Sequence, residues 1–437
     1  MRTNVATPSV YTHEGGTATR TSALQELRRT VMTCMLWENT FYEKGSATAT
    51  RIAELVAVLP AEQVVDVAIE ARKAQYLRHT PLFIMRELAR RTGPGIGAQV
   101  ERGLYAVIER ADELAEFIAM YWKDKKQPIS NPVKRGLAAA FTKFNEYALA
   151  KYDRANAVRL RDVLFMVHAK PLNEDMAAIW KKLVDNKLET PDTWEVALSA
   201  GADKKATFER LLEEKKLGGL AVVRNLRNMA QAGVDRELIA SRLEQGLSKV
   251  LPFRFITAAR YTPQFEPMLE SAMLASIKDM PRIARSTGLL IDVSGSMDAT
   301  VSSKSETTRL EAACGLAILL RELAPDLRVA TFSNKAVEVP ARRGFALRDA
   351  IVNSQAHSST DTEMGVNFCK KSWPGIERFI IITDEQAAPT RTPDGFSPAN
   401  YIINVATYQY GIGVGRNYTT INGWSERVLD YIQAVEE

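Results

Sequence analysis

The stretch GLLIDVSGS, residues 288–296, decides the fold of the second part of this 437-residue chain. Its apolar run GLLI is typical of a strand that is buried on both faces of a sheet. Further short runs rich in Ile, Val and Leu follow in LRVATFS (327–333), RFIIITD (378–384) and YIINVAT (401–407), with helical patterns between them. Strands that alternate with helices in this way predict a doubly wound α/β sheet over residues 286–437.

Upstream of this sheet the sequence predicts one short helix after another. Apolar residues recur at helical spacing, for example Ile239, Leu243 and Leu247, and almost no strand pattern lies between the helices. Many short helices with brief connections favour an α-solenoid, whose long exposed surface suits a large ligand. We therefore predict two domains, an all-α binding domain from about residue 21 to residue 280 and the α/β domain over residues 286–437.

The composition is that of a folded protein, with 46% hydrophobic and 25% charged residues. It excludes a largely disordered chain, and no run approaches the ~18 consecutive apolar residues of a membrane helix. The polar start MRTNVATPSVYTHEGG lacks the apolar core of a secretory signal. The three cysteines, Cys34, Cys314 and Cys369, are far apart, as in proteins of a reducing compartment. We therefore expect the protein in the cytoplasm.

The net charge of +5 hides an asymmetry between the two predicted domains. Residues 286–437 carry 14 Lys and Arg against 18 Asp and Glu, a net charge of −4, so the rest of the chain carries +9. A basic helical domain beside a mildly acidic one indicates that a polyanion binds the helical domain. A solvated Lys- and Arg-rich helical surface would give the same numbers.

Polar oxygens follow the buried strands of the predicted sheet at three places. Asp292, Ser294 and Ser296 alternate directly after the first strand, Thr360 lies in the polar loop HSSTDT, and Asp384 ends a later strand. In α/β folds the carboxyl ends of the strands form the ligand-binding edge. Two carboxylates with neutral hydroxyls suit Mg²⁺, with Mn²⁺ or Ca²⁺ as alternatives. A capped strand–helix junction without a metal is the simpler interpretation of DxSxS alone.

With these residues in place, the α/β part resembles a known family. The runs IDVSGSM (291–297), SSTDT (358–362) and IIITDE (380–385) are similar to the von Willebrand factor A fold with its metal-ion-dependent adhesion site. The resemblance implies that the metal is held by Asp292, Ser294, Ser296, Thr360 and Asp384.

The helical part carries a second resemblance. RKAQYLRHTPLFIMRELAR (72–90), KYDRANAVRLRDVLFMVHAKP (151–171) and LGGLAVVRNLRNM (217–229) look like segments of the TROVE module of the Ro autoantigen family. Together the two resemblances cover the chain from about residue 15 to its end, and they imply a TROVE-like α-helical repeat domain over residues 15–285 and a von Willebrand factor A-like domain over residues 286–437. They indicate a bacterial- or phage-type Ro ribonucleoprotein homologue.

The resemblance implies a monomeric ring of HEAT-like α-helical repeats that is closed by the von Willebrand factor A domain. Members of this family bind small noncoding Y RNA on the outer face of the ring. They also take single-stranded 3′ ends of misfolded RNAs through its hole, in RNA quality control and processing. Bacterial relatives tether an exoribonuclease, polynucleotide phosphorylase, through Y RNA. No catalysis by the protein itself is implied.

Phosphate binding needs Lys and Arg side chains, and each contact steepens the salt dependence of binding. The candidate RNA contacts are Arg72, Arg78, His79, Lys134, Arg135, Arg159, Arg161, His168 and Lys170. For each of them a solvated helix face or a structural ion pair is the alternative, and the two histidines could be core residues. Arg224 and Arg227, three positions apart, could line a further basic surface, although Arg224 could equally be a packing residue.

The sequence departs from the family at one place. Relatives typically carry a Trp-Ser-His-Lys-Asp run where this chain reads Val158-Arg159-Leu160-Arg161-Asp162. The first His of that run is missing, and Phe165 replaces a basic residue, so the specificity for Y RNA is open. The main alternative function is a metal-dependent protein-interaction module without RNA specificity, whose acidic ligand completes the metal shell. A phosphatase would need a second carboxylate at position 294, which is Ser.

Overall fold

The computed structural model describes residues 22–33, 45–73, 77–153, 156–245, 247, 250, 252–280, 282–301, 305–324, 326–386, 392–406, 415–422, 432 and 436. The chain forms two compact units. One comprises Thr21–Glu38 and Lys44–Asp192, and the other contains Thr193–Glu437 together with Met1–Arg20 and Asn39–Glu43. The start of the predicted repeat domain at residue 15 lies outside the described residues. We call the two units the N-terminal unit and the C-terminal unit.

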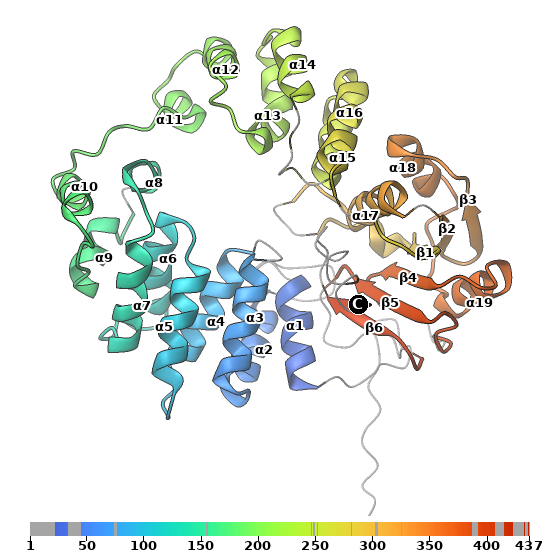
Figure 1. The fold of residues 1–437 in the computed structure, drawn as a ribbon, viewed down its shortest axis with the longest axis horizontal. Coiled ribbons are helices and arrows are strands. Elements are labelled where there is room, and N and C mark those ends of the chain that lie inside the picture. Colours follow the sequence, from blue (N-terminus) through green and yellow to red (C-terminus); the bar gives the residue numbers. More distant parts are fainter. Residues whose placement is uncertain are drawn as a thin grey trace, which may run out of the picture. The chain divides into compact units, whose positions relative to one another are not determined.

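The N-terminal unit consists of short helices that pack on their neighbours in sequence (Figure 1). They are α1 (Ala23–Thr33), α2 (Gly45–Val58), α3 (Ala61–Lys73), α4 (His79–Ala89), α5 (Ile96–Val107), α6 (Ala111–Tyr121), α7 (Asn131–Phe141), α8 (Glu146–Tyr152), α9 (Leu160–Val167) and α10 (Glu174–Val184). Each helix places apolar residues at helical spacing into one continuous core. The expected helical repeats are thus present.

The C-terminal unit begins with further short helices. They are α11 (Trp194–Ser199), α12 (Lys204–Glu213), α13 (Gly219–Gln231), α14 (Arg236–Glu244), α15 (Pro252–Tyr261), the 3₁₀ turn η1 (Pro263–Phe265) and α16 (Glu266–Ile277). The change from helices to strands falls between α16 and β1, which begins at Thr287. The compact units, in contrast, divide after Asp192, because α13–α16 share a core with the sheet that follows them.

The rest of the C-terminal unit is a six-stranded sheet in the order β3-β2-β1-β4-β5-β6, with β3 antiparallel and the others parallel. Its elements are β1 (Thr287–Asp292), η2 (Gly295–Asp298), α17 (Arg309–Leu323), β2 (Leu327–Phe332), β3 (Ala336–Val339), α18 (Gly344–Val352), α19 (Thr362–Ser372), β4 (Arg378–Thr383), β5 (Ala399–Asn404) and β6 (Thr419–Asn422). This arrangement confirms the predicted doubly wound α/β fold. The final segment, 424–437, lies outside the described residues apart from Ile432 and Glu436.

Alternate residues of the central strand point into two different cores. Leu289 and Ile291 of β1 pack with α17, whereas Leu290 packs with Val366 and Cys369 of α19. Every residue of β1 is buried, which is the physical reason for its continuous apolar sequence. The two helical layers hold the sheet so that the carboxyl ends of β1 and β4 remain at one edge. Among the described residues, no helix combines the length and the apolar character that a membrane span requires.

Gly365 allows α19 to lie close to the sheet. A Cβ atom at this position would lie 2.9 Å from the Cβ of Phe332 and 3.2 Å from Leu290. Helix propensity alone favours alanine over glycine by about 1 kcal/mol. Overpacking of a filled core costs about 1–3 kcal/mol and has the opposite sign.

We therefore expect Gly365→Ala to lower the free energy of unfolding of the C-terminal unit by about 1 kcal/mol, because the clash outweighs the gain in propensity. Urea unfolding followed by circular dichroism measures the change. Lys370→Ala, at an exposed position of the same helix, is the control and should leave the midpoint almost unchanged. An increase in stability for Gly365→Ala would mean that α19 can move away from the sheet at little cost.

Candidate functional site

Two buried aspartates lie at the carboxyl edge of the sheet. Asp292 ends β1 and Asp384 directly follows β4, and these strands pair in parallel. Both carboxylates are 0% exposed. The Thr383 hydroxyl donates to Asp292 Oδ2 at 2.7 Å, and the Ser294 backbone N–H donates to Asp292 Oδ1 at 2.8 Å. The parallel pairing thus brings together two carboxylates that are far apart in sequence.

The hydroxyl groups of the candidate site come from two loops that contact each other. Ser294 Oγ and Ser296 Oγ are 3.2 Å apart in the turn after β1. The Gly295 N–H donates to the Ser358 carbonyl oxygen at 3.0 Å, so this turn lies against the loop that carries Thr360. Thr360 itself is buried at 6% exposure. The structure therefore gathers all five predicted metal ligands at the same edge of the sheet.

Ser333, at the end of β2, positions the Thr360 loop and was missed by the sequence analysis. Its hydroxyl accepts the Ser358 N–H at 2.9 Å and donates to the Ser359 carbonyl at 2.9 Å. Its carbonyl accepts the Asp361 N–H at 3.0 Å. These bonds surround Thr360 on both sides along the chain. The signal in the sequence was a polar residue after a buried strand, which is too common a pattern to single it out.

His357 ties the same loop to the turn after β1. Its Nδ1 lies 2.8 Å from Asp298 Oδ2, and its Nε2 lies 3.0 Å from the Val352 carbonyl oxygen. Asp298 belongs to η2, two residues after Ser296. The two hydroxyl-bearing loops are thus cross-linked by a side-chain contact as well as by the backbone.

The electrostatics of this edge are those of a site that attracts a cation. Burial, and then the negative charge of Asp384, raise the pKa of Asp292 to about 7, against the hydrogen bonds from Thr383 and Ser294. Two carboxylates and three hydroxyl groups form a hard, oxygen-only donor set, which fits Mg²⁺ or Mn²⁺. The described residues contain no cluster of three or more His, Cys, Asp or Glu that could hold a metal. A metal here would depend on the hydroxyls as much as on the carboxylates.

Arg309 is a buried counter-ion of this site that the sequence analysis did not identify. It is 2% exposed and opens α17, where Thr308 caps the helix. Its Nη1 donates to Asp384 Oδ2 at 3.2 Å and to the Ser296 carbonyl oxygen at 3.0 Å. One guanidinium therefore neutralises part of the charge of the two carboxylates. A divalent ion at Asp384 has to compete with it.

The N-terminal unit contains the predicted RNA contacts, and two of them have a structural role. Arg72 is 6% exposed, and its Nη2 donates to Glu113 Oε1 at 2.8 Å while its Nε donates to the Val107 carbonyl at 2.9 Å. Arg78 donates to Asp112, Glu113 and Glu116 at 3.0–3.3 Å. Carboxylates already occupy both guanidinium groups, so a phosphate would have to compete with them, and the RNA contacts of Arg72 and Arg78 stay predictions.

Three further candidates are paired; Arg135 and His79 are exposed to solvent, and Arg159 is half-buried. Arg135 bonds Glu101 Oε1 through its Nε at 2.8 Å, and Arg159 donates to Asp153 at 2.7 Å as it begins α9. The His79 ring is 51% exposed and lies 3.5 Å from Glu116, so His79 is not a core histidine. A phosphate could reach these side chains only by competing with a carboxylate.

The remaining candidates gather on and after α9. This helix turns Leu160, Val163, Leu164 and Val167 into the core. Its opposite face carries Arg161, whose closest carboxylate oxygen is 3.8 Å away on Asp162, and Phe165, which is 59% exposed. His168 ends the helix in the left-handed conformation, with φ 53°, and is exposed, as is Lys170. We call Arg161, Phe165, His168 and Lys170 the α9 surface.

Lys134 lies outside this surface, on α7 after Ser130 and Pro132. It is half-buried and has no ion pair within the described part of the chain. In contrast, the neighbouring residue Arg135, also on α7, is paired with Glu101.

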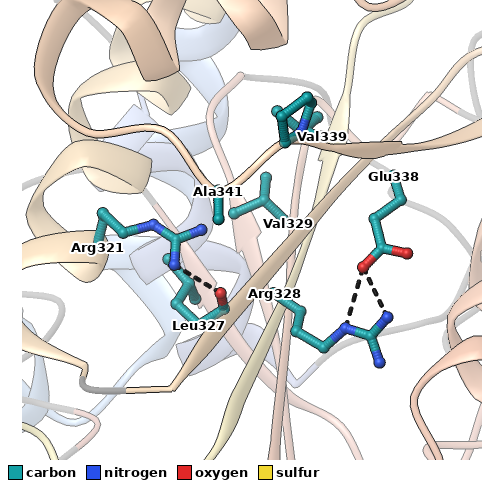
Figure 2. A pocket seen from close by; sticks show the side chains of 8 residues that line it. Arg321, Leu327, Arg328, Val329, Glu338, Val339 and Ala341 are labelled. Carbon is teal, nitrogen blue, oxygen red and sulfur yellow. Dashed lines mark hydrogen bonds and ion pairs between the residues drawn. The ribbon is translucent and has the colours of Figure 1, made fainter.

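A pocket of about 370 Å³ lies elsewhere in the C-terminal unit (Figure 2). Its lining includes Arg321, Leu327, Arg328 and Glu338. Leu327 is the first residue of β2 and pairs with Thr287, the first residue of β1. The pocket is therefore at the amino ends of the strands, opposite Asp292. Figure 2 shows Arg328 bonded to Glu338 and Arg321 bonded to the Leu327 carbonyl, so its polar groups are already engaged.

Family comparisons match two parts of the chain that overlap over residues 287–312. The TROVE domain matches residues 181–312, and the Ro60 vWA domain matches residues 287–394. The two segments 72–90 and 151–171, which resemble the TROVE module by sequence, lie outside the first match. The segment 217–229 lies within it.

Similar proteins include telomerase protein component 1 of Mus musculus, 36% identical over 92 residues, which are 20% of this chain and 4% of that protein. The RNA-binding protein RO60 of Caenorhabditis elegans is 24% identical over 265 residues, 55% of this chain and 40% of that protein. This chain thus spans less than half of the length of these relatives.

The fold of this chain is similar to that of a solved structure. The Deinococcus radiodurans RO (RSR) protein matches with a TM-score of 0.61 and 17% identity, over 94% of this chain and 99% of that chain. The match supports the observed sequence of helical repeats followed by an α/β domain.

Removal of the Arg309 charge should strengthen metal binding, because the metal no longer competes with a guanidinium for Asp384. We expect Arg309→Met to bind Mn²⁺ about tenfold more tightly than the wild type, as measured by isothermal titration calorimetry. Arg328→Met is the matched control, since Arg328 pairs with Glu338 at the other end of the strands. Unchanged or weaker binding in Arg309→Met would show that Arg309 orients Asp384 for the metal.

The raised pKa of Asp292 also sets a pH dependence of stability. Without metal, the folded protein binds more protons than the unfolded chain between the usual pKa of an aspartate and about 7. The free energy of unfolding therefore falls as the pH rises through this window. We expect the urea midpoint in EDTA to decrease from pH 5 to pH 8, and to decrease less in Asp292→Asn. Equal slopes for both proteins would contradict a buried, protonated Asp292.

Proposed function

Because this chain belongs to the Ro family, with a TROVE domain followed by a von Willebrand factor A domain, we propose that it is the RNA-binding scaffold of a ribonucleoprotein. The succession of these two family matches along one chain is the observation that carries the proposal. The name of the RNA-binding protein RO60, which is similar over 55% of this chain, supports it.

The α9 surface has the chemistry that an RNA ligand requires. Arg161 and Lys170 provide positive charge for phosphates, and His168 adds a hydrogen-bonding ring. Phe165, on the same helix as Arg161, is 59% exposed, and single-stranded bases stack on exposed aromatic rings. Arg161 and Phe165 are four residues apart and so are neighbours on the helix. Exposed cations next to an exposed aromatic ring favour RNA over a purely electrostatic ligand.

The finer proposal is that the RNAs are small noncoding, Y-like RNAs and the 3′ ends of misfolded or structured RNAs. The place of the protein would be in RNA quality control or processing in the cytoplasm. Phe165 and the missing His of the Trp-Ser-His-Lys-Asp run lead us to expect a specificity different from that of typical relatives. An exoribonuclease such as polynucleotide phosphorylase would then supply the catalysis, and the scaffold none.

The metal centre carries the second candidate function. Asp292, Ser294, Ser296, Thr360 and Asp384 would hold Mg²⁺, which would leave a coordination position for an acidic side chain of a partner protein. In that case the protein is a metal-dependent protein-interaction module. The gathering of all five ligands at one sheet edge favours this role for the site. The α9 surface is made of other residues, so both functions are compatible.

RNA binding is tested by a gel shift with a structured RNA that carries a single-stranded 3′ tail, over a salt series. We expect Arg161→Glu/Lys170→Glu to weaken binding at least tenfold at physiological salt. The slope of log K against log salt should fall by about 1.4, because two phosphate contacts are lost. Lys181→Glu/Lys187→Glu, on and after α10, makes the same change of charge at exposed positions and is the control.

Equal loss in both double variants would mean that only the net charge matters. No RNA binding by the wild type at any salt would contradict the proposed scaffold. Binding of RNA in EDTA as strong as in Mg²⁺ separates this function from the metal-dependent one. If the protein instead captures an acidic protein partner only with Mg²⁺, and no RNA, the second candidate is the correct one.

A further inference from the structure

An exposed tyrosine lies beside two arginines in the C-terminal unit, far in sequence from the α9 surface. Tyr261 is the last residue of α15 and is 38% exposed. The guanidinium carbon of Arg227, on α13, is 5.1 Å from the centre of the tyrosine ring. That of Arg260 is 4.9 Å away. We call these three residues the Tyr261 cluster.

The two arginines of the cluster are held to different degrees. Arg260 is anchored, because it donates to the Glu306 carbonyl oxygen and lies 3.1 Å from Glu311. Arg227 is 51% exposed, and its closest carboxylate, on Glu306, is 4.0 Å away. The stack on the tyrosine ring, worth about 0.5–1 kcal/mol at such exposed sites, is therefore the main contact that orients the Arg227 guanidinium.

The cluster continues along α13. Arg224 is exposed, one turn before Arg227, and makes no ion pair among the residues that the structure describes. Its exposure shows that it is not a packing residue, whereas its neighbours Val223, Asn225 and Leu226 are buried. Arg224 and Arg227 are three residues apart and lie on the same face of the helix. Arg224 thus adds a second accessible guanidinium group to the face of α13 that carries Arg227.

Tyr261 is not among the residues of the buried core of the C-terminal unit. Phe255, Ile256 and Ala259 form the buried side of α15, each no more than 1% exposed. The tyrosine follows at the end of the helix, where its ring projects beyond this core. An aromatic ring and guanidinium planes are the surfaces on which unpaired bases stack, and the cations beside them suit the adjacent phosphates. In a duplex, stacking on the neighbouring base pairs already covers the base faces.

We propose that the Tyr261 cluster is a stacking site for an unpaired base of single-stranded RNA, with Arg224 and Arg227 at the neighbouring phosphates. The inference rests on the proposed RNA-binding function and adds a second contact surface to it. The site lies beside the segment 305–309. Glu306 of this segment contacts the cluster, and Arg309 contacts Asp384 of the metal centre. RNA at this cluster would therefore lie beside the segment whose Arg309 pairs with Asp384 of the candidate metal centre.

The test uses the full-length protein and a 5′-fluorescein-labelled ten-nucleotide oligouridylate, with binding measured by fluorescence anisotropy over a salt series. Stacking contacts are worth about five- to one-hundred-fold in affinity per base. We expect Tyr261→Leu to weaken binding at least fivefold without a change in the salt slope, because no charge is lost. Tyr261→Phe keeps the ring and should bind within about twofold of the wild type. Arg227→Gln should weaken binding and lower the slope by about 0.7.

Tyr105→Leu is the matched control. Tyr105 is 49% exposed and has the Lys143 ammonium 4.8 Å from its ring, but it belongs to α5 of the N-terminal unit. The Tyr105→Leu variant should bind the oligonucleotide with the affinity of the wild type. Thermal unfolding of each variant checks the fold, and the recovery of binding in Tyr261→Phe separates stacking from a folding defect.

Equal binding by the wild type and Tyr261→Leu would overturn the stacking site while leaving RNA binding by the protein intact. A loss of affinity in Tyr261→Phe as large as in Tyr261→Leu would also overturn it, since the ring is still present. If the wild type binds neither this oligonucleotide nor the structured RNA, the proposed RNA-binding function itself fails.

Discussion

The parallel pairing of β1 with β4 is the constraint on which the C-terminal unit depends. The register places Ile291 opposite Ile382, so that Asp292 and Asp384 both emerge at the carboxyl edge of the sheet. The same two strands are entirely buried and bring their alternate side chains to two cores. A slip of one residue would turn the apolar side chains to the wrong face and separate the two aspartates. The stability of the fold and the geometry of the candidate metal site therefore depend on the same strand pairing.

Ion pairs within the protein determine which basic side chains of this chain are accessible to bind a ligand. Arg72 and Arg309 are both buried, and each is compensated by a carboxylate, because an unpaired buried charge would be very costly. Arg161 and Arg227 are oriented less tightly and keep their guanidinium groups near solvent. The positive charge of the helical part is thus divided between structural and accessible groups, and net charge alone does not distinguish them.

The local patterns of the sequence predicted much of this architecture. The apolar runs around Leu290 and Ile381 gave strands buried on both faces, and the helical spacing of Ile239 and Leu243 gave a buried helix face. The alternation of Asp292, Ser294 and Ser296 predicted the turn whose oxygens gather at the sheet edge. The roles of Ser333 and Arg309 could not be predicted from the sequence. Ser333 and Arg309 contribute through residues that are close only after the sheet has formed.

The sequence by itself determined the elements, the change from helical repeats to an α/β sheet, and the oxygen ligands of the candidate metal centre. These follow from periodicity and from hydrogen bonds between near neighbours, which short stretches of chain encode. Only the tertiary structure decided which cations are accessible. Glu113, the partner of Arg72, is 41 residues away in sequence, and Asp384, the partner of Arg309, is 75 residues away. No local sequence pattern therefore predicts either ion pair. For the same reason the ring of Tyr261 meets Arg227 only after α13 and α15 have packed together.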